Sequence, residues 1–224
     1  ELGQNGANVV VNYRSSEAAA ADAVETISDS GGDAMAARAD IAEYDQVAAM
    51  KDEVHDRFGP IDVLVNNAAI TVDKKFENMT REDWDRVIDV NLGGTFNCTH
   101  CFFDDIRSAE EGRLINISSV VGQQGNYGQA NYATTKSGLF GFTRTLALEL
   151  ASEGSTANCV APGFADTGML DIVPERVREK ILRRIPLGRF ATPEDVAGIV
   201  RFVASDDSSY MTGQILAING GMEW

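Results

Sequence analysis

A tyrosine and a lysine four positions apart, Tyr132 and Lys136, carry side chains that can together move a proton. They lie in the run GQANYATTK at residues 128–136, which opens a long amphipathic segment, and in a helix residues four apart share one face. An ammonium group beside a phenol favours the phenolate, so we expect Lys136 to lower the pKa of Tyr132 from about 10. Such a phenol is a usable general acid, and Ser119 in the preceding loop can hold a substrate oxygen against it.

A bare Tyr-x-x-x-Lys spacing is a weak signal, because most such pairs are an interfacial tyrosine beside a solvated lysine. Three further motifs accompany it here: NNAA at residues 66–69 after an apolar run, Asn91 within VNL at 90–92, and Pro162-Gly163 after another apolar run. With these four motifs in this order, the chain resembles the short-chain dehydrogenase/reductase family. The resemblance extends from residue 2 to residue 221.

The resemblance implies a catalytic group made of Asn91, Ser119, Tyr132 and Lys136. Tyr132 would donate its proton to a carbonyl oxygen as hydride arrives from a nicotinamide, and Ser119 would hydrogen-bond that oxygen. Lys136 would bind the nicotinamide ribose and depress the Tyr132 pKa. Asn91 would hold a water that returns the proton through Lys136.

The expected cofactor is NADP(H). An NAD-specific fold places an acid at the end of its second strand. The strand that matches it here, residues 8–13, is followed by Arg14, and no acid occurs before Glu17. Arg14 is placed to pair with a 2′-phosphate through its bidentate fork, and a solvated loop arginine is the plainer alternative. The resemblance adds further cofactor positions besides Tyr132 and Lys136: Asp40, Ile41, Asn67, Pro162, Gly163 and Thr167.

The substrate expected from the resemblance is a 3-oxoacyl thioester. Residues 79–85 and 122–129 resemble 3-oxoacyl-thioester reductases, and most of all acetoacetyl-CoA reductases of polyhydroxyalkanoate synthesis. On that basis a lid at residues 168–188 would cover an acyl pocket lined by Asp73, Asn126, Tyr127, Gln129 and Phe164.

The main alternative is a 3-oxoacyl-acyl-carrier-protein reductase of fatty-acid synthesis. Those enzymes tend to present basic residues to their acidic carrier, whereas this chain has Glu110, Glu111 and Glu153 at the matching positions. Because acid facing acid is repulsive, this difference favours a CoA thioester. Arg183, Arg184 and Arg189 could still meet a phosphate on either carrier.

Two other readings of the chain stay open. One is a sugar or alcohol dehydrogenase of the same family, because pocket specificity is poorly encoded in such loops. The other is a non-catalytic, nucleotide-sensing scaffold. The intact set of Asn91, Ser119, Tyr132 and Lys136 argues against the scaffold.

The elements that must position these residues alternate between strands and helices. Apolar β-rich runs predict strands at residues 8–13, 33–39, 61–65, 114–117, 156–161 and 214–218, with helices between them that include 43–58, 80–108, 127–153 and 174–184. This pattern predicts an α/β fold, a doubly wound, Rossmann-like parallel sheet with helices on both faces, as one domain over residues 1–224. Residues 1–7 have the pattern of a helix end, so we expect a strand and a Gly-rich, pyrophosphate-binding turn before them, a truncated, cofactor-free protein being the alternative.

The composition excludes several functional classes. Among 224 residues, 34 are acidic and 19 basic, giving a net charge of −15, which argues against nucleic acid and anionic membranes as partners. This acidic, Lys-poor surface favours salt adaptation over an ordinary acidic enzyme. Three cysteines fit a reducing cytoplasm, and the Cys98-Thr99-His100-Cys101 run lacks a second Cys/His pair, so no metal site is expected. Asp104-Asp105 is expected to face solvent, and the resemblance implies a homotetramer that takes a small acyl thioester.

Overall fold

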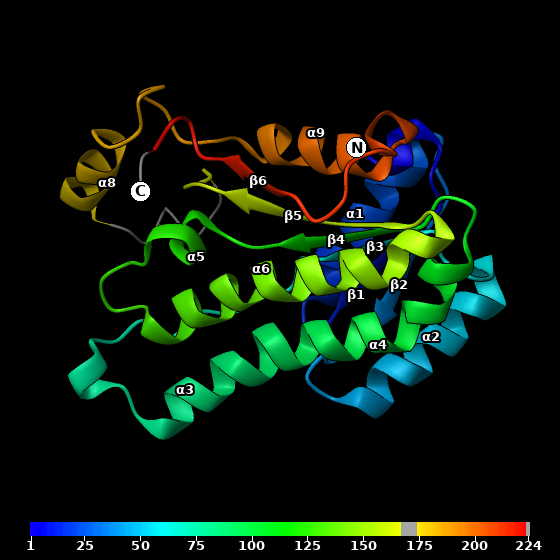
Figure 1. Ribbon diagram of the computed structural model, residues 1–224, viewed down its shortest axis with the longest axis horizontal. Helices are drawn as coiled ribbons and strands as arrows, with labels where there is room; N and C mark the ends of the chain where they lie inside the picture. The colour runs from blue at the N-terminus through cyan, green and yellow to red at the C-terminus, as the bar shows by residue number, and fades with distance from the viewer. Residues whose placement is uncertain (167–173, 223–224) are drawn as a thin grey trace.

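The structure is a computed structural model that describes residues 1–166 and 174–222 (Figure 1). All strand pairs in these ranges are parallel, and they form two ladders. The first pairs β1 (Val9–Tyr13) with β2 (Ala34–Arg38). The second has the spatial order β3 (Val63–Asn66), β4 (Arg113–Ile117), β5 (Thr156–Pro162) and β6 (Ile215–Ile218).

Helices cover both faces of the strands, which confirms the predicted Rossmann-like α/β class (Figure 1). One face carries α1 (Glu17–Asp29) and α9 (Pro193–Ala204). The other carries α2 (Tyr44–Phe58), α4 (Gly94–Ser108) and α6 (Ala130–Leu150). Shorter elements complete the described chain: η1 (Gly3–Asn5), η2 (Phe76–Asn78), α3 (Arg81–Ile88), η3 (Asp89–Gly93), α5 (Val120–Gln124), η4 (Ala151–Glu153), α8 (Glu175–Leu182) and η5 (Asp206–Ser208).

Strand β4 is buried between the two layers of helices. Successive side chains of a strand point to opposite faces, and all five residues of β4 are buried. Leu114 packs with Leu150 of α6, whereas the next residue, Ile115, packs in the cluster that holds Val203 of α9. The strand is therefore buried on both faces, as a parallel strand between two helical layers must be.

Two features depart from the expected elements. The helix expected over residues 80–108 is interrupted by the π-helical turn η3, which carries Asn91, and the short helix α5 after Ser119 was not expected. Helix α3 begins where the sequence predicts a helix to begin, with a reciprocal capping box between the side chains of Thr80 and Asp83. Thr192 and Asp195 form another capping box at the start of α9.

The carboxyl ends of β3, β4, β5 and β6 lie along one edge of the sheet, beside α5 and the start of α6 (Figure 1). This edge is where open α/β sheets bind ligands. Within the described ranges, no helix combines the length and the apolar character that crossing a membrane requires.

Candidate active site

Helix α6 places Tyr132 and Lys136 on one face, as their spacing predicts. The Lys136 ammonium lies 5.7 Å from the centroid of the Tyr132 ring. Its Nζ donates a hydrogen bond of 2.7 Å to the Ile117 carbonyl at the end of β4, and the Ser118 hydroxyl donates one of 2.7 Å to the Lys136 carbonyl. These two bonds attach the Lys136 turn of α6 to the carboxyl end of β4, so the position of the buried ammonium is set by the sheet.

The ionisation of this pair differs from the expectation. Burial lowers the pKa of Lys136 to about 8, because desolvation disfavours the ammonium. Burial also raises the pKa of Tyr132, and the Asp73 carboxylate adds to the rise, while a side-chain hydrogen bond with Ser119 acts against it. The expectation that Lys136 lowers the Tyr132 pKa is therefore wrong for this structure, where the loss of water around the phenol is the dominant effect.

Ser119 ends the extended segment after β4 and begins α5. Its Oγ accepts a hydrogen bond of 3.1 Å from the backbone N–H of Val121, which makes it the N-cap of that helix. Gly122 then lets α5 approach α6 very closely, because a Cβ at this position would lie 2.7 Å from the backbone carbon of Lys136. The close approach holds Ser119 against the face of α6 that carries Tyr132.

Asn91 occupies the π-helical turn between α3 and α4, a distortion often found at functional sites. Its side chain is buried and exchanges two hydrogen bonds with the backbone of Ile70, accepting at 2.8 Å and donating at 3.0 Å. The second amide hydrogen reaches the Thr135 hydroxyl at 3.1 Å. Asn91 thus joins the loop after β3 to α6.

The expected cofactor residues fall along the carboxyl ends of several strands. Arg14 and Asp40 lie at the ends of β1 and β2, and a 3.7 Å ion pair joins them, with the arginine side chain 52% exposed. Ile41 is buried against Gly94, and its carbonyl accepts a bond from Asn97. Asn67 follows β3 and is exposed, Pro162 ends β5, Gly163 follows it, and Thr167 lies outside the described residues.

Three of the expected substrate residues form a chain of hydrogen bonds. The Gln129 amide donates to both carboxylate oxygens of Asp73, at 2.9 and 3.0 Å, and accepts from Asn126 at 2.8 Å. Tyr127 is strongly exposed, and Phe164 packs in the apolar cluster that includes Tyr132.

The expected lid lies only partly within the described residues. Residues 168–173 of the lid fall outside them. The remainder contains α8 and Ile185, which packs in the same cluster as Phe164.

Three residues that hold the site were not singled out from the sequence. Ser118 holds the Lys136 turn, Gly122 allows the approach of α5, and Asn131 joins α6 to two other segments. Each lies inside or beside a motif that was recognised. A polar residue at a position that the helix must bury was the only available signal for Asn131.

The acidic residues used to compare carriers lie away from this edge. Glu110 and Glu111 precede β4 and Glu153 lies before β5, so all three are at the amino ends of the strands. At about 3.3 Å per residue, β4 alone spans about 13 Å, and Glu111 and Ser119 lie beyond its opposite ends. Within one chain, these carboxylates do not face a carrier docked at Ser119, so the charge argument against a carrier protein does not hold at this chain's own site.

The two cysteines of α4 lie in the core of the protein. Cys98 and Cys101 are buried in α4, and burial raises the pKa of the Cys98 thiol to about 12. Among the described residues, no group of three or more His, Cys, Asp and Glu side chains is arranged to hold a metal ion.

Comparison with known proteins extends the resemblance over the whole chain. The family model described as enoyl-(acyl carrier protein) reductase matches residues 1–223. A 3-oxoacyl-(acyl-carrier-protein) reductase of Staphylococcus aureus is 47% identical over 222 residues, which cover 99% of this chain and 90% of the relative. Reductases of the same name from Synechocystis sp. and Thermotoga maritima are 47% identical over 222 residues (99% and 89% covered) and 49% identical over 182 residues (81% and 74% covered).

Proposed function

Because the chain belongs to the short-chain dehydrogenase/reductase family, we propose that it uses NADPH to reduce 3-oxoacyl thioesters to 3-hydroxyacyl thioesters. The protein is an oxidoreductase acting on CH–OH groups. The observation that carries the proposal is the meeting of Tyr132, Lys136 and Ser119 at the carboxyl edge of a parallel sheet.

In the proposed reaction, the Tyr132 phenol gives its proton to the 3-oxo oxygen while the carbonyl carbon accepts a hydride. A reduced nicotinamide held by Lys136 would supply that hydride. The Tyr132 phenol is protonated at neutral pH, which is the state that a proton donor needs. Burial makes it a weaker acid by raising its pKa, and the hydrogen bond with Ser119 opposes that rise. Ser119 hydrogen-bonds the same oxygen and so holds it within reach of the phenol.

The residues present fit a phosphorylated nicotinamide cofactor. Lys136 keeps its ammonium at the end of β4, and the Ile117 carbonyl is the one partner recorded for its three N–H donors among the described residues, which leaves donors for ribose hydroxyls. Arg14 offers an exposed guanidinium at the end of β1 for a 2′-phosphate. Asp40 shares that cation, so a bound 2′-phosphate must compete with a carboxylate that is already 3.7 Å away.

Two carriers of the acyl group are considered. The names of the relatives favour an acyl-carrier-protein thioester, and the acids that argued against it lie at the opposite edge of the sheet. Acetoacetyl-CoA, with a place in polyhydroxyalkanoate synthesis, is the second candidate, favoured by the sequence of residues 79–85 and 122–129. Both carriers present the same 3-oxo group to Tyr132.

The test is NADPH consumption by the complete chain with three substrate classes: a carrier-protein 3-oxoacyl thioester, acetoacetyl-CoA, and a panel of sugars and alcohols. We expect turnover of the thioesters, with the higher kcat/KM identifying the carrier. Tyr132→Phe should lose nearly all turnover and keep NADPH affinity, because it removes one hydroxyl and retains the ring. Faster turnover of a sugar or alcohol, or wild-type turnover by Tyr132→Phe, would overturn the proposal.

We further propose a homotetramer adapted to high salt in the cytoplasm. The support for assembly is the family resemblance together with exposed apolar groups on helices that face outward, such as Phe96 of α4 and Leu148 of α6. The support for salt adaptation is the net charge of −15. Light scattering that gives a monomer would contradict the tetramer.

A further inference from the structure

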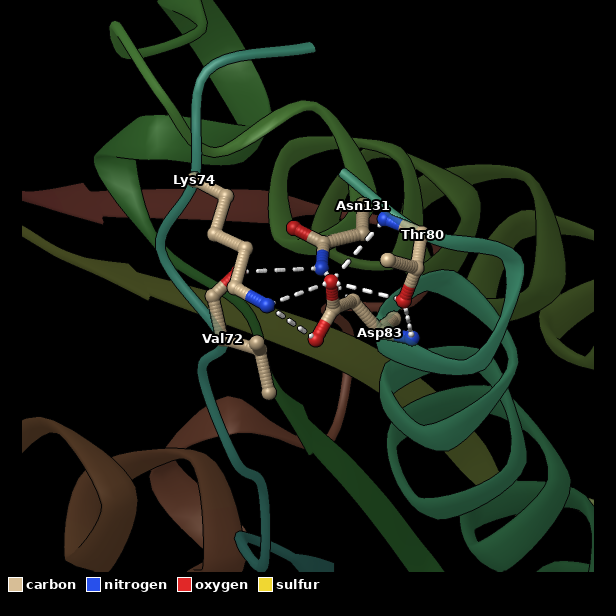
Figure 2. Close-up of polar contacts among 5 residues, drawn as sticks. All are labelled: Val72, Lys74, Thr80, Asp83 and Asn131. Atoms are coloured by element: carbon tan, nitrogen blue, oxygen red, sulfur yellow. Dashed lines mark hydrogen bonds and ion pairs between the residues drawn. The ribbon is translucent and has the colours of Figure 1, made fainter. Parts of the chain in front are cut away.

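Asn131, the residue immediately before Tyr132, makes hydrogen bonds that connect three segments of the chain (Figure 2). The Asn131 side chain is buried, and its Nδ2 donates to the carbonyl oxygens of Val72 at 3.1 Å and Asp83 at 3.2 Å. Its Oδ1 accepts the backbone N–H of Tyr132 at 2.8 Å. One amide therefore joins the loop after β3, the first turn of α3 and the first turn of α6.

The α3 side of this connection is itself held firmly. Lys74 donates to both carboxylate oxygens of Asp83, at 2.8 and 2.9 Å, and the same carboxylate accepts the backbone N–H and the hydroxyl of Thr80 (Figure 2). The hydrogen bond from Lys74, followed by those from Thr80, lowers the pKa of Asp83 to about 2, so the carboxylate is ionised at neutral pH. The Asp83 carbonyl that Asn131 reaches is thus part of a capped and ion-paired helix start.

The loop after β3 is fastened to α6 and the segment before it at further points. The backbone N–H of Lys74 donates to the Gly128 carbonyl at 2.8 Å, and the Asp73 carboxylate accepts from Gln129. The Asp73 carboxylate is also close enough to Tyr132 to raise the pKa of the phenol. The loop held by Asn131 therefore brings a charged group to the phenol.

The choice of residue at this position has a chemical reason. A buried amide is costly unless its donors and acceptor find partners, and Asn131 satisfies both hydrogens and its oxygen with backbone groups. The N-cap residue of α6, Gln129, makes no side-chain capping bond, so Asn131 supplies an acceptor for an N–H group of the first turn. An alanine here would leave two carbonyls and one N–H without these partners.

We propose that Asn131, supported by Asp83 and Lys74, is a positioning residue for the reaction. It fixes the Tyr132 turn of α6 relative to the loop that carries Asp73, and so sets where the phenol meets the 3-oxo group. This inference rests on the proposed function, since it concerns the geometry of proton donation. A misplacement of about 1 Å at a reacting group lowers the rate by about a hundredfold.

The first test compares Asn131→Ala with the wild-type chain for kcat, for the dissociation constant of NADPH, and for amide hydrogen exchange at Tyr132 and residues 70–74. We expect kcat to fall by at least about tenfold, NADPH affinity to stay within about threefold, and exchange to rise in both segments. An unchanged kcat, or a loss of kcat matched by an equal loss of NADPH affinity, would overturn the positioning role.

The second test does not depend on the stability of Asn131→Ala. Asp83→Asn removes the ion pair with Lys74 and keeps an oxygen for the Thr80 N–H, whereas Asp85→Asn on the same helix removes an exposed ion pair with Arg81. We expect Asp83→Asn to lower kcat by roughly threefold and Asp85→Asn to leave it unchanged. Equal effects of the two variants would contradict the proposal.

The two proposals fail in distinguishable ways. If the wild-type chain does not reduce 3-oxoacyl thioesters, the proposed function is wrong, and hydrogen exchange still measures whether Asn131 holds the loop and α6 together. If the wild-type chain is active and the Asn131→Ala and Asp83→Asn variants match it, the positioning role alone is wrong.

Discussion

The packing of α5 against α6 allows a sharp prediction for Gly122→Ala. An added Cβ would lie 2.7 Å from the carbonyl carbon of Lys136 and 2.9 Å from its carbonyl oxygen, and these backbone atoms cannot rotate away. Ordinary carbon contacts are about 3.5 Å or longer, so α5 must move from α6 by about 0.8 Å. That displacement carries Ser119, the N-cap of α5, away from Tyr132.

The expected cost of this movement is larger for catalysis than for stability. Overpacking of this kind costs about 1–3 kcal/mol in the free energy of unfolding, and the gain from Gly→Ala within a helix offsets about 0.5–1 kcal/mol of it. The displacement at the reacting groups should lower kcat by about a hundredfold. NADPH affinity should change little, because the Lys136 ammonium remains attached to the Ile117 carbonyl.

The assay measures kcat, NADPH affinity and the urea unfolding midpoint for Gly122→Ala and for a matched control, Gly198→Ala. A Cβ at Gly198, in α9, would meet no atom within 4 Å, so the control has the same chemical change without the contact. We expect the control to have wild-type kcat. Wild-type kcat in Gly122→Ala would show that the distance between α5 and α6 does not set the geometry of Ser119 and Tyr132.

Three further predictions concern charge. Burial lowers the pKa of Lys136 to about 8, so kcat/KM should fall as pH rises through that value and the ammonium loses its proton. Lys136→Arg should move this alkaline fall to higher pH, because a guanidinium stays charged. A fall that remains near pH 8 in the variant would assign it to another group. Arg14→Gln should raise the KM for NADPH by about 10- to 100-fold, because a charge-assisted hydrogen bond to a phosphate contributes about 1.5–3 kcal/mol. The KM for NADH, which lacks that phosphate, should stay nearly unchanged. Equal effects on the two cofactors would contradict a contact between Arg14 and the 2′-phosphate. The melting temperature should rise from low to molar salt, because screening weakens the self-repulsion of a chain with a net charge of −15; a Tm independent of salt would contradict salt adaptation.

The parts of the fold that the sequence predicted are those with a repeating physical signal. The strand at residues 114–117 was predicted from its apolar run, and the structure extends it only to Arg113. The spacing of Tyr132 and Lys136 predicted one helical face because a long helix has a fixed period. The helix expected from residue 80 begins there because the Thr80 side chain bonds its own backbone, an interaction that acts locally.

The parts that the sequence could not predict depend on contacts between distant segments. The π-helical turn at Asn91 differs from the α-helix around it in hydrogen bonding, and no distinctive residue type marks it in the sequence. Helix α5 has only five residues, which is too short to show a periodic pattern. Asp105 is an acid that was expected to face solvent, but it is buried between α2 and α4, where its carboxylate lies 2.7 Å from His55 Nε2. Which backbone groups Asn131 would meet also depends on the approach of α3, which no local pattern encodes.

The positions of three acidic residues limit what the charge of this chain says about its acyl carrier. Glu110, Glu111 and Glu153 lie at the amino ends of β4 and β5, whereas Ser119 and Pro162 lie at or beyond the carboxyl ends of the same strands. A single chain therefore presents its site and these acids to different regions of solvent. They can oppose an acidic carrier only if a second copy places its own acids beside this chain's Ser119. Discrimination between CoA and a carrier protein by these acids would therefore require an assembly of several copies. Within one chain, Arg184, which donates a hydrogen bond to Gln124 of α5, is a cationic group on the side of the site.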